Sequence, residues 1–153
     1  MYSWKSKANG ETDFVYEVGE VVSRVAGELG CRARGGYVVK GKSGVSHFFD
    51  YMVCEEPLVV VSVGRSSSME DCIYEVLAFA IKVIDSNGCG VYVALAKPSQ
   101  SFRDILHELS SRIGWRLLVV DGSQPIEIVK SDVERAVNDM VSRAKLNPPA
   151  NLS

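Results

Sequence analysis

The chain has 153 residues, of which 46% are hydrophobic and 24% charged, and its formal net charge at pH 7 is −2. This length supports one domain with a substantial core but not two comfortable ones, and the charge gives no overall attraction to nucleic acid or to membrane surfaces. No apolar run reaches the roughly 18 residues of a membrane span, and the first residues lack an apolar signal core. We therefore expect a cytoplasmic protein that does not enter a membrane.

The first half of the chain reads as one helix followed by strands. Thr12 or Asp13 can cap a helix that ends at Gly30, because valines repeat between them at helical spacing. Strand-like runs follow at residues 36–41, 45–53 and 57–63. The last of these runs is almost continuously apolar, which is typical of a central strand buried on both faces.

The second half alternates helices with strands. We predict a helix at 69–86, a strand at 91–96, a helix between Ser101 and Gly114, a strand at 116–121, and a helix to about Leu146 that starts with the capping box Ser131–Glu134. The order α-β-β-β-α-β-α-β-α predicts a single α/β domain over residues 13–146, with a mixed central sheet between helices. Residues 1–12 and 147–153 are expected to be flexible tails.

The four cysteines are scattered along the chain and form no C-x-x-C pair, which does not favour a zinc site. We expect all four to be reduced, mostly buried small hydrophobes: Cys31, Cys54, Cys72 and Cys89.

Residues 36–43, GYVVKGKS, match the phosphate-loop pattern G-x-x-x-x-G-K-[ST], and LLVVD at 117–121 looks like the magnesium-binding strand that accompanies such a loop. A working phosphate loop follows a buried strand and runs into a helix, whose N-terminus binds phosphate. Here GCRARG precedes the pattern and GVSHFFDYM follows it, and Tyr-Val-Val inside it favours extended structure. We interpret the stretch as a β-hairpin and disfavour a nucleotide hydrolase.

The hairpin, the third strand and the following helix and strand resemble the PD-(D/E)xK fold of restriction endonucleases, archaeal Holliday-junction resolvases and Mrr-like proteins. The resemblance covers about residues 14–121, and G-K-S-G-V-x-H-x-F-D looks like the G-x-S-G-x-x-H-x-F-D lead-in of that group. It implies a restriction-endonuclease-like sheet. It also implies an acid on the second strand, an acid and a lysine two apart on the third, and often a glutamate from the first helix, around Mg²⁺.

Asp50 matches the first of these acids and is the candidate metal ligand. The third strand departs from the family pattern, because Ser62 is no anionic ligand and Gly64 has no side chain. The nearest cation, Arg65, points to the opposite face if the strand continues, and a guanidinium cannot serve as a base in proteins. This departure predicts a degenerate active site.

Two further carboxylates could complete a relocated site. Glu17 lies on the flank of the first helix and is the candidate helix glutamate, although a solvated glutamate is the alternative. Ser62 with Glu75 could imitate nucleases of this fold that recruit a glutamate from the following helix. Lys82 or Lys42 would then have to supply the lysine.

Basic residues gather before and within the hairpin, with no acid among them: Arg32, Arg34, Lys40 and Lys42, followed by His47. They could contact nucleic-acid phosphates, or they could be the lysines and arginines of a solvated edge hairpin, where they discourage sheet-to-sheet pairing.

We therefore predict a nuclease-fold protein without catalysis and without a required cofactor, which binds DNA, RNA or a protein partner. The alternative is an active Mg²⁺-dependent endonuclease that uses Asp50, Glu17 and Glu75. The apolar stripe of the last helix and the apolar strands also suggest a homodimer.

Overall fold

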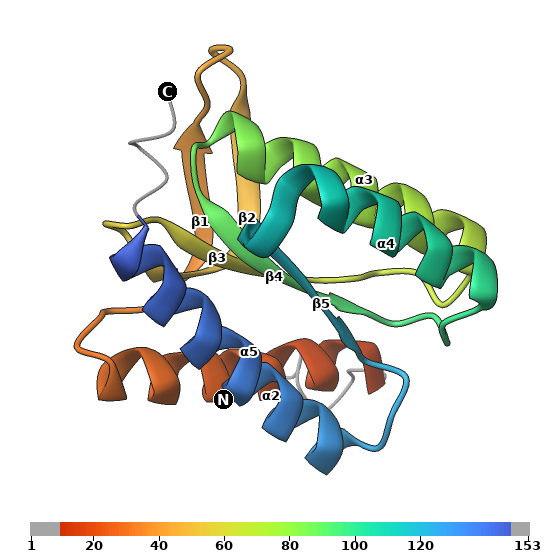
Figure 1. Ribbon diagram of the computed structural model, residues 1–153. Helices are drawn as coiled ribbons and strands as arrows, with labels where there is room; N and C mark the ends of the chain where they lie inside the picture. The colour runs from red at the N-terminus through yellow and green to blue at the C-terminus, as the bar shows by residue number, and fades with distance from the viewer. Residues whose placement is uncertain (1–9, 148–153) are drawn as a thin grey trace.

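Five strands form one mixed sheet, and their order in the sheet follows their order in the chain (Figure 1). The structure, a computed structural model, describes residues 10–147. Its elements are α2 (Gly10–Glu28), β1 (Arg34–Lys40), β2 (Ser46–Cys54), β3 (Val59–Val63), α3 (Met69–Asp85), β4 (Cys89–Ala94), α4 (Gln100–Ile113), the 3₁₀ turn η1 (Gly114–Arg116), β5 (Leu117–Asp121) and α5 (Ile126–Leu146). The predicted α/β class and element order are confirmed, and every strand boundary lies within two residues of its predicted place.

The sheet changes from antiparallel to parallel at its centre. β1, β2 and β3 pair antiparallel, whereas β3, β4 and β5 pair parallel. The helices α3 and α4 make the two crossovers between the parallel strands. β3 therefore lies between β2 and β4, as its continuous run of apolar residues predicts.

Two helices cover each face of the sheet (Figure 1). The valines of α2 and α5 pack on one face, and the apolar sides of α3 and α4 pack on the other around Phe49, Phe79 and Phe102. No helix within residues 10–147 is long and apolar enough to cross a membrane.

Three helix starts differ from their predicted places. α2 begins at Gly10, so residues 10–12 belong to a helix and not to a tail. Ser99, rather than Ser101, caps α4, because its hydroxyl accepts a hydrogen bond from the Phe102 N–H at 3.1 Å. α5 begins at Ile126, which puts the predicted capping box inside the helix. The remaining predicted tail residues, 1–9 and 148–153, lie outside the described residues.

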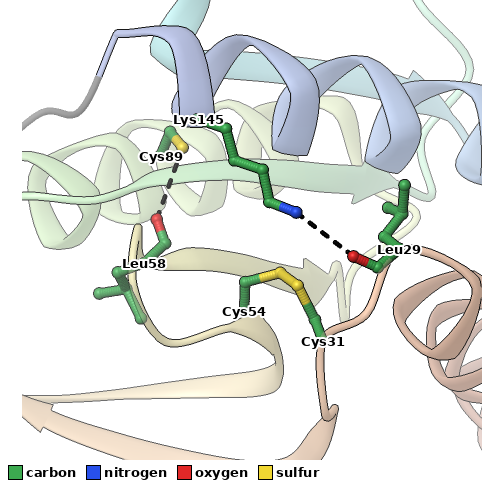
Figure 2. Close-up of a disulfide and its surroundings, with 6 residues drawn as sticks. All are labelled: Leu29, Cys31, Cys54, Leu58, Cys89 and Lys145. Carbon is green, nitrogen blue, oxygen red and sulfur yellow. Dashed lines mark hydrogen bonds between the residues drawn. A yellow bond between two sulfur atoms is a disulfide. The ribbon is translucent and has the colours of Figure 1, made fainter.

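A disulfide joins Cys31, just after α2, to Cys54 at the end of β2 (Figure 2). Their Cα atoms are 5.3 Å apart. The prediction that all four cysteines are reduced is therefore wrong for this pair. Cys72 and Cys89 are free and buried as predicted, and burial raises the pKa of the Cys89 thiol to about 12.

A tyrosine of β2 fixes the distance between the sheet and α2. The Tyr51 hydroxyl donates a hydrogen bond to the Val15 carbonyl at 2.8 Å. A Cβ added at Gly19 would overlap this hydroxyl, so the helix needs a glycine at that position to approach the sheet so closely.

Candidate functional site

The Gly-Lys-Ser-Gly turn at the hairpin tip surrounds a carboxylate of its own chain, that of Asp85 at the end of α3. The Ser43 N–H donates to Asp85 Oδ1 at 2.9 Å, and the Ser43 hydroxyl donates to Oδ2 at 2.7 Å. His47 Nε2 lies 2.6 Å from the same Oδ2. These hydrogen bonds, from Ser43 first and then His47, lower the pKa of Asp85 to about 2.

The predicted hairpin is confirmed, because β1 and β2 pair antiparallel. A phosphate loop would be followed by a helix, whereas this turn is followed by the strand β2. Inside the turn, the N–H and the hydroxyl of Ser43, which could have faced a phosphate, both bond to the Asp85 carboxylate. A Cβ at Gly41 would overlap the Asp85 carboxylate, so the first glycine of the turn serves this internal contact.

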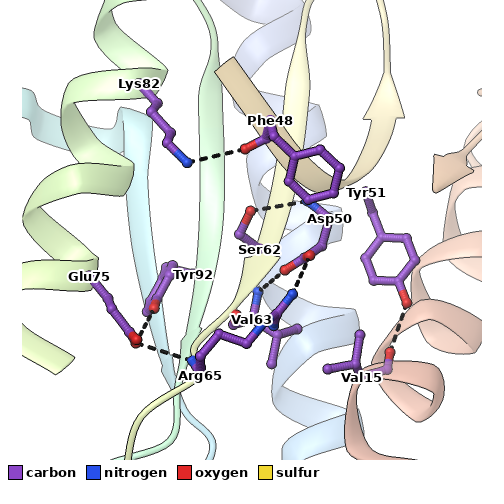
Figure 3. Close-up of polar contacts among 10 residues, drawn as sticks. All are labelled: Val15, Phe48, Asp50, Tyr51, Ser62, Val63, Arg65, Glu75, Lys82 and Tyr92. Carbon is purple, nitrogen blue, oxygen red and sulfur yellow. Dashed lines mark hydrogen bonds and ion pairs between the residues drawn. The ribbon is translucent and has the colours of Figure 1, made fainter. Parts of the chain in front are cut away.

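A cleft of about 210 Å³ lies between β2, β3 and α3, and it contains most of the predicted catalytic residues (Figure 3). Its polar and aromatic lining includes Phe48, Asp50, Ser62, Arg65, Glu75 and Lys82. The structure therefore brings together Asp50, Ser62 and Glu75, which lie on three different elements.

Asp50 uses both carboxylate oxygens within the protein. The Val63 N–H donates to Oδ2 at 2.8 Å, and Arg65 Nη2 lies 2.7 Å from Oδ1 (Figure 3). The Asp50 side chain is 10% exposed, whereas that of Arg65 is 51% exposed. Arg65 thus supplies the positive charge next to the carboxylate that the family resemblance assigns to a metal.

The expectation that Arg65 points away from Ser62 required the strand to continue, and β3 ends at Val63. Beyond the strand the alternation of side chains no longer applies, and the guanidinium turns back over the cleft. It also donates through Nη1 to the Val63 carbonyl at 2.7 Å.

Glu75 lies on the α3 side of the cleft, with Arg65 between it and Asp50 (Figure 3). Its Oε1 accepts hydrogen bonds from the Tyr92 hydroxyl at 2.8 Å and from the Arg65 N–H at 3.2 Å. Burial, and then the Glu75 carboxylate, raise the pKa of Tyr92 well above its usual range. Arg65 thus contacts both carboxylates of the cleft, Asp50 through its guanidinium and Glu75 through its backbone N–H.

Lys82 also lines the cleft, and its Nζ donates to the Phe48 carbonyl at 3.3 Å. Lys42 does not line it, because it lies at the exposed hairpin tip. Of the two lysines that the sequence offers for the missing position, Lys82 is therefore the one near Asp50.

Glu17 lies outside this cleft, and its predicted place there is wrong. It lines a groove of about 770 Å³ between α2 and α5, on the other face of the sheet. Lys130 Nζ lies 2.8 Å from Glu17 Oε1. The flank of α2 on which Glu17 lies thus faces α5 and not the sheet edge.

The candidate nucleic-acid residues lie along the edge strand β1 and not in one compact patch. Arg32 and Arg34 lie at its start, and Lys40 and Lys42 lie at its end, all four exposed. Strand geometry separates the two pairs by about 20 Å. His47 is turned toward Asp85, with its side chain 11% exposed, so the geometry does not present it to a ligand.

Sequence reasoning missed the roles of Asp85 and Tyr92 and misplaced the side chain of Arg65. Asp85 had one visible signal, an acid at the C-terminal end of an apolar helix, where the helix dipole disfavours negative charge and a donor is needed. Tyr92 had none, because it lies inside a buried strand.

Within residues 10–147, no group of three or more His, Cys, Asp and Glu is arranged to hold a metal ion.

No family model and no curated protein matches this chain. Among solved structures, the chain is similar to the crystal structure of AF1548, a protein of unknown function, with 15% sequence identity and a TM-score of 0.49. The similarity covers 75% of this chain, and it spans 64% of the length of that protein. A likeness of this size identifies neither a family nor an activity for the chain.

Proposed function

We propose that this protein is a non-cleaving domain of nuclease-like fold that binds nucleic acid through the β1–β2 hairpin. One observation carries the proposal: Arg65 forms an ion pair with the Asp50 carboxylate, while the four basic side chains in and before the hairpin are exposed to solvent. A metal ion would have to displace an internal cation to reach Asp50. The hairpin cations need no such rearrangement to reach a phosphate.

The sheet topology supports the resemblance behind this proposal. Three antiparallel strands follow the first helix, and a crossover helix leads to a parallel fourth strand, which is the element order that the PD-(D/E)xK resemblance implies. We place the binding in the cytoplasm, as the sequence predicts, whereas the Cys31–Cys54 disulfide is a bond that persists mainly in oxidising compartments.

Fluorescence anisotropy with labelled 20-nucleotide DNA and RNA, single-stranded and duplex, tests the binding. Reversal of the hairpin charges by glutamate substitution should abolish it: Arg32, Arg34, Lys40 and Lys42. The logarithm of the binding constant falls linearly with the logarithm of the salt concentration. Each single reversal should reduce the steepness of this fall by about 0.9 on duplex DNA and about 0.7 on single strands. Glutamate at Arg112 and Arg143, exposed on α4 and α5, is the matched control and should leave the affinity unchanged.

The same protein should cut none of these substrates, nor supercoiled or branched DNA, when Mg²⁺ or Mn²⁺ is added. Asp50→Asn should cost little affinity, because Asp50 is bonded to Arg65 and not to the ligand. Metal-dependent cutting that disappears with Asp50→Asn would refute the proposal.

One observation favours a second candidate function, a Mg²⁺-dependent endonuclease: Asp50, Ser62, Glu75 and Lys82 line one cleft. Carboxylate oxygens are the ligands that Mg²⁺ takes. In the arrangement present here they do not fit a metal ion, because the Arg65 guanidinium is paired with Asp50 and no group of three or more His, Cys, Asp and Glu within residues 10–147 is arranged to hold one. Cutting that depends equally on Asp50 and Glu75, and not on Glu17, would favour this function.

A protein partner, including a second copy of the chain, is the remaining alternative to nucleic acid. Failure to bind any of the nucleic acids, combined with a dimer in sedimentation at tens of micromolar protein, would favour it.

A further inference from the structure

One face of the β1–β2 hairpin presents apolar side chains to solvent. Val38 and Phe48 are direct cross-strand partners, and they are 59% and 51% exposed. On the diagonal from Phe48 lies Gly36, where an added Cβ would come within 3.8 Å of the ring. Gly36 has φ +61°, a conformation that favours glycine, so the backbone leaves this side of the ring without a covering side chain.

Positive charges border this open ring. Lys40 lies two residues after Val38 and therefore shares its face of the strand. Arg65 and Lys82 line the cleft that Phe48 borders. Within the cleft, Asp50 is paired with the Arg65 guanidinium, whereas Glu75 accepts a hydrogen bond from Arg65 only through the neutral backbone N–H of that residue. The two acids and two cations of the cleft therefore balance, and the additional positive charge beside the ring is that of Lys40. An aromatic ring is thus exposed at the mouth of the cleft, with Lys40 on its own face of the hairpin.

We propose that Phe48 stacks against an unpaired base, and that the ligand of this hairpin face is single-stranded nucleic acid. The inference rests on the nucleic-acid binding proposed above and names its substrate class. Stacking on an exposed aromatic side chain beside cations is the physical basis of single-strand binding, because every unpaired base offers a free face. A duplex keeps its bases stacked inside, and it could use only the cations.

Anisotropy with labelled (dT)₁₅, and with the same strand in a blunt duplex with (dA)₁₅, tests the proposal. Phe48→Ala should weaken single-strand binding about fivefold to hundredfold, as loss of one stacked base does, and should leave duplex binding within about twofold. Phe48→Tyr keeps a ring and should bind like the parent. Ile128→Ala is the matched control, because Ile128 is a comparably exposed apolar residue, 47% accessible, on α5 at the other face of the sheet.

A second measurement reports stacking without relying on affinity. Tryptophan introduced by Phe48→Trp should lose fluorescence when (dT)₁₅ is added, whereas tryptophan introduced by Ile128→Trp should not. The native Trp4 and Trp115 also fluoresce, and the same titration of the parent protein measures their contribution.

The outcomes separate this inference from the function on which it rests. If charge reversal abolishes binding but Phe48→Ala changes single-strand and duplex affinity equally, the stacking inference fails and the hairpin function stands. Binding of duplex as tightly as single strand would also overturn the inference. If neither nucleic acid binds, both proposals fail. Self-association that Phe48→Ala disrupts would then assign this face to a second copy of the chain.

Discussion

Loss of Arg65 should destabilise the protein more than loss of the charge on the acid that it contacts. Arg65→Ala leaves the Asp50 carboxylate, 10% exposed, with one remaining donor, the Val63 N–H. Asp50→Asn leaves a guanidinium that is already 51% exposed and can turn into water. The asparagine also keeps an acceptor oxygen for Val63. The two substitutions remove the same ion pair, but the first leaves a largely buried charge without its partner and the second leaves a largely exposed one.

The size of the difference follows from burial. Two unit charges 4 Å apart attract by about 4 kcal/mol at an effective dielectric constant of 20. Exposure of the Arg65 side chain reduces this gain, because exposed pairs contribute about 0–1 kcal/mol. A part-buried charged group that loses a hydrogen-bond partner costs about 1.5–3 kcal/mol. We expect Arg65→Ala to lower the free energy of unfolding by about 2 kcal/mol and Asp50→Asn by about 1 kcal/mol.

Urea unfolding followed by circular dichroism measures both variants. In a chain of this size, the Arg65→Ala loss corresponds to a fall in Tm of about 4–8 °C. Arg112→Ala is the control. It breaks an ion pair with Glu108 at 3.1 Å whose side chains are 74% and 67% exposed, and it should cost under about 0.5 kcal/mol. The reasoning is refuted if Asp50→Asn lowers the free energy of unfolding as much as Arg65→Ala does, or if the control Arg112→Ala lowers it as much as either variant.

Four further changes test other parts of the fold. Alanine at Gly27, where an added Cβ meets nothing within 4 Å, should raise the free energy of unfolding by about 0.5–1 kcal/mol. Alanine at Gly19 should lower it by about 2 kcal/mol, because it displaces a hydrogen-bonded tyrosine; parallel urea titrations compare the two. Alanine at both Cys31 and Cys54 should lower the free energy of unfolding by about 3 kcal/mol, because the bond closes a loop with a separation of 23 residues. Thiol titration of the unfolded parent should find two thiols before reduction and four after it. Because the pKa of Asp85 is lowered to about 2, its stabilisation should be complete above about pH 4 and lost as the pH falls through about 2, so the urea midpoints of the parent and Asp85→Ala should converge in acid.

The order of the elements could be read from the sequence because each element has its own period and its own stop signal. The continuous apolar run of β3 and the helical repeat that starts near Met69 differ strongly enough to separate strand from helix. The same repeat put Glu75 and Lys82 on one flank of their helix. That flank does line the cleft with Ser62. Side chains on a regular element can be placed from its period once the packing direction is known.

The features that sequence reasoning missed depend on contacts between distant segments. Arg65 lies beyond a strand end, where no period applies, and its position is set by Asp50, fifteen residues earlier. Glu17 was placed on the correct helix but assigned to the wrong neighbour, because the position of α5 cannot be read from α2. The two bonded cysteines have no signature in a chain whose other two cysteines are buried and free.

The Cys31–Cys54 bond has a consequence for the candidate ligand surface. Together with the chain between them, the bonded cysteines close a covalent macrocycle that contains the whole β1–β2 hairpin, from Arg34 to Cys54. Preorganised segments lose less conformational entropy when they bind a ligand. We therefore expect reduction of this bond to weaken affinity for the proposed ligand without removing any contact to it. Reduction opens the ring, and the same side chains would then be presented from a less constrained hairpin.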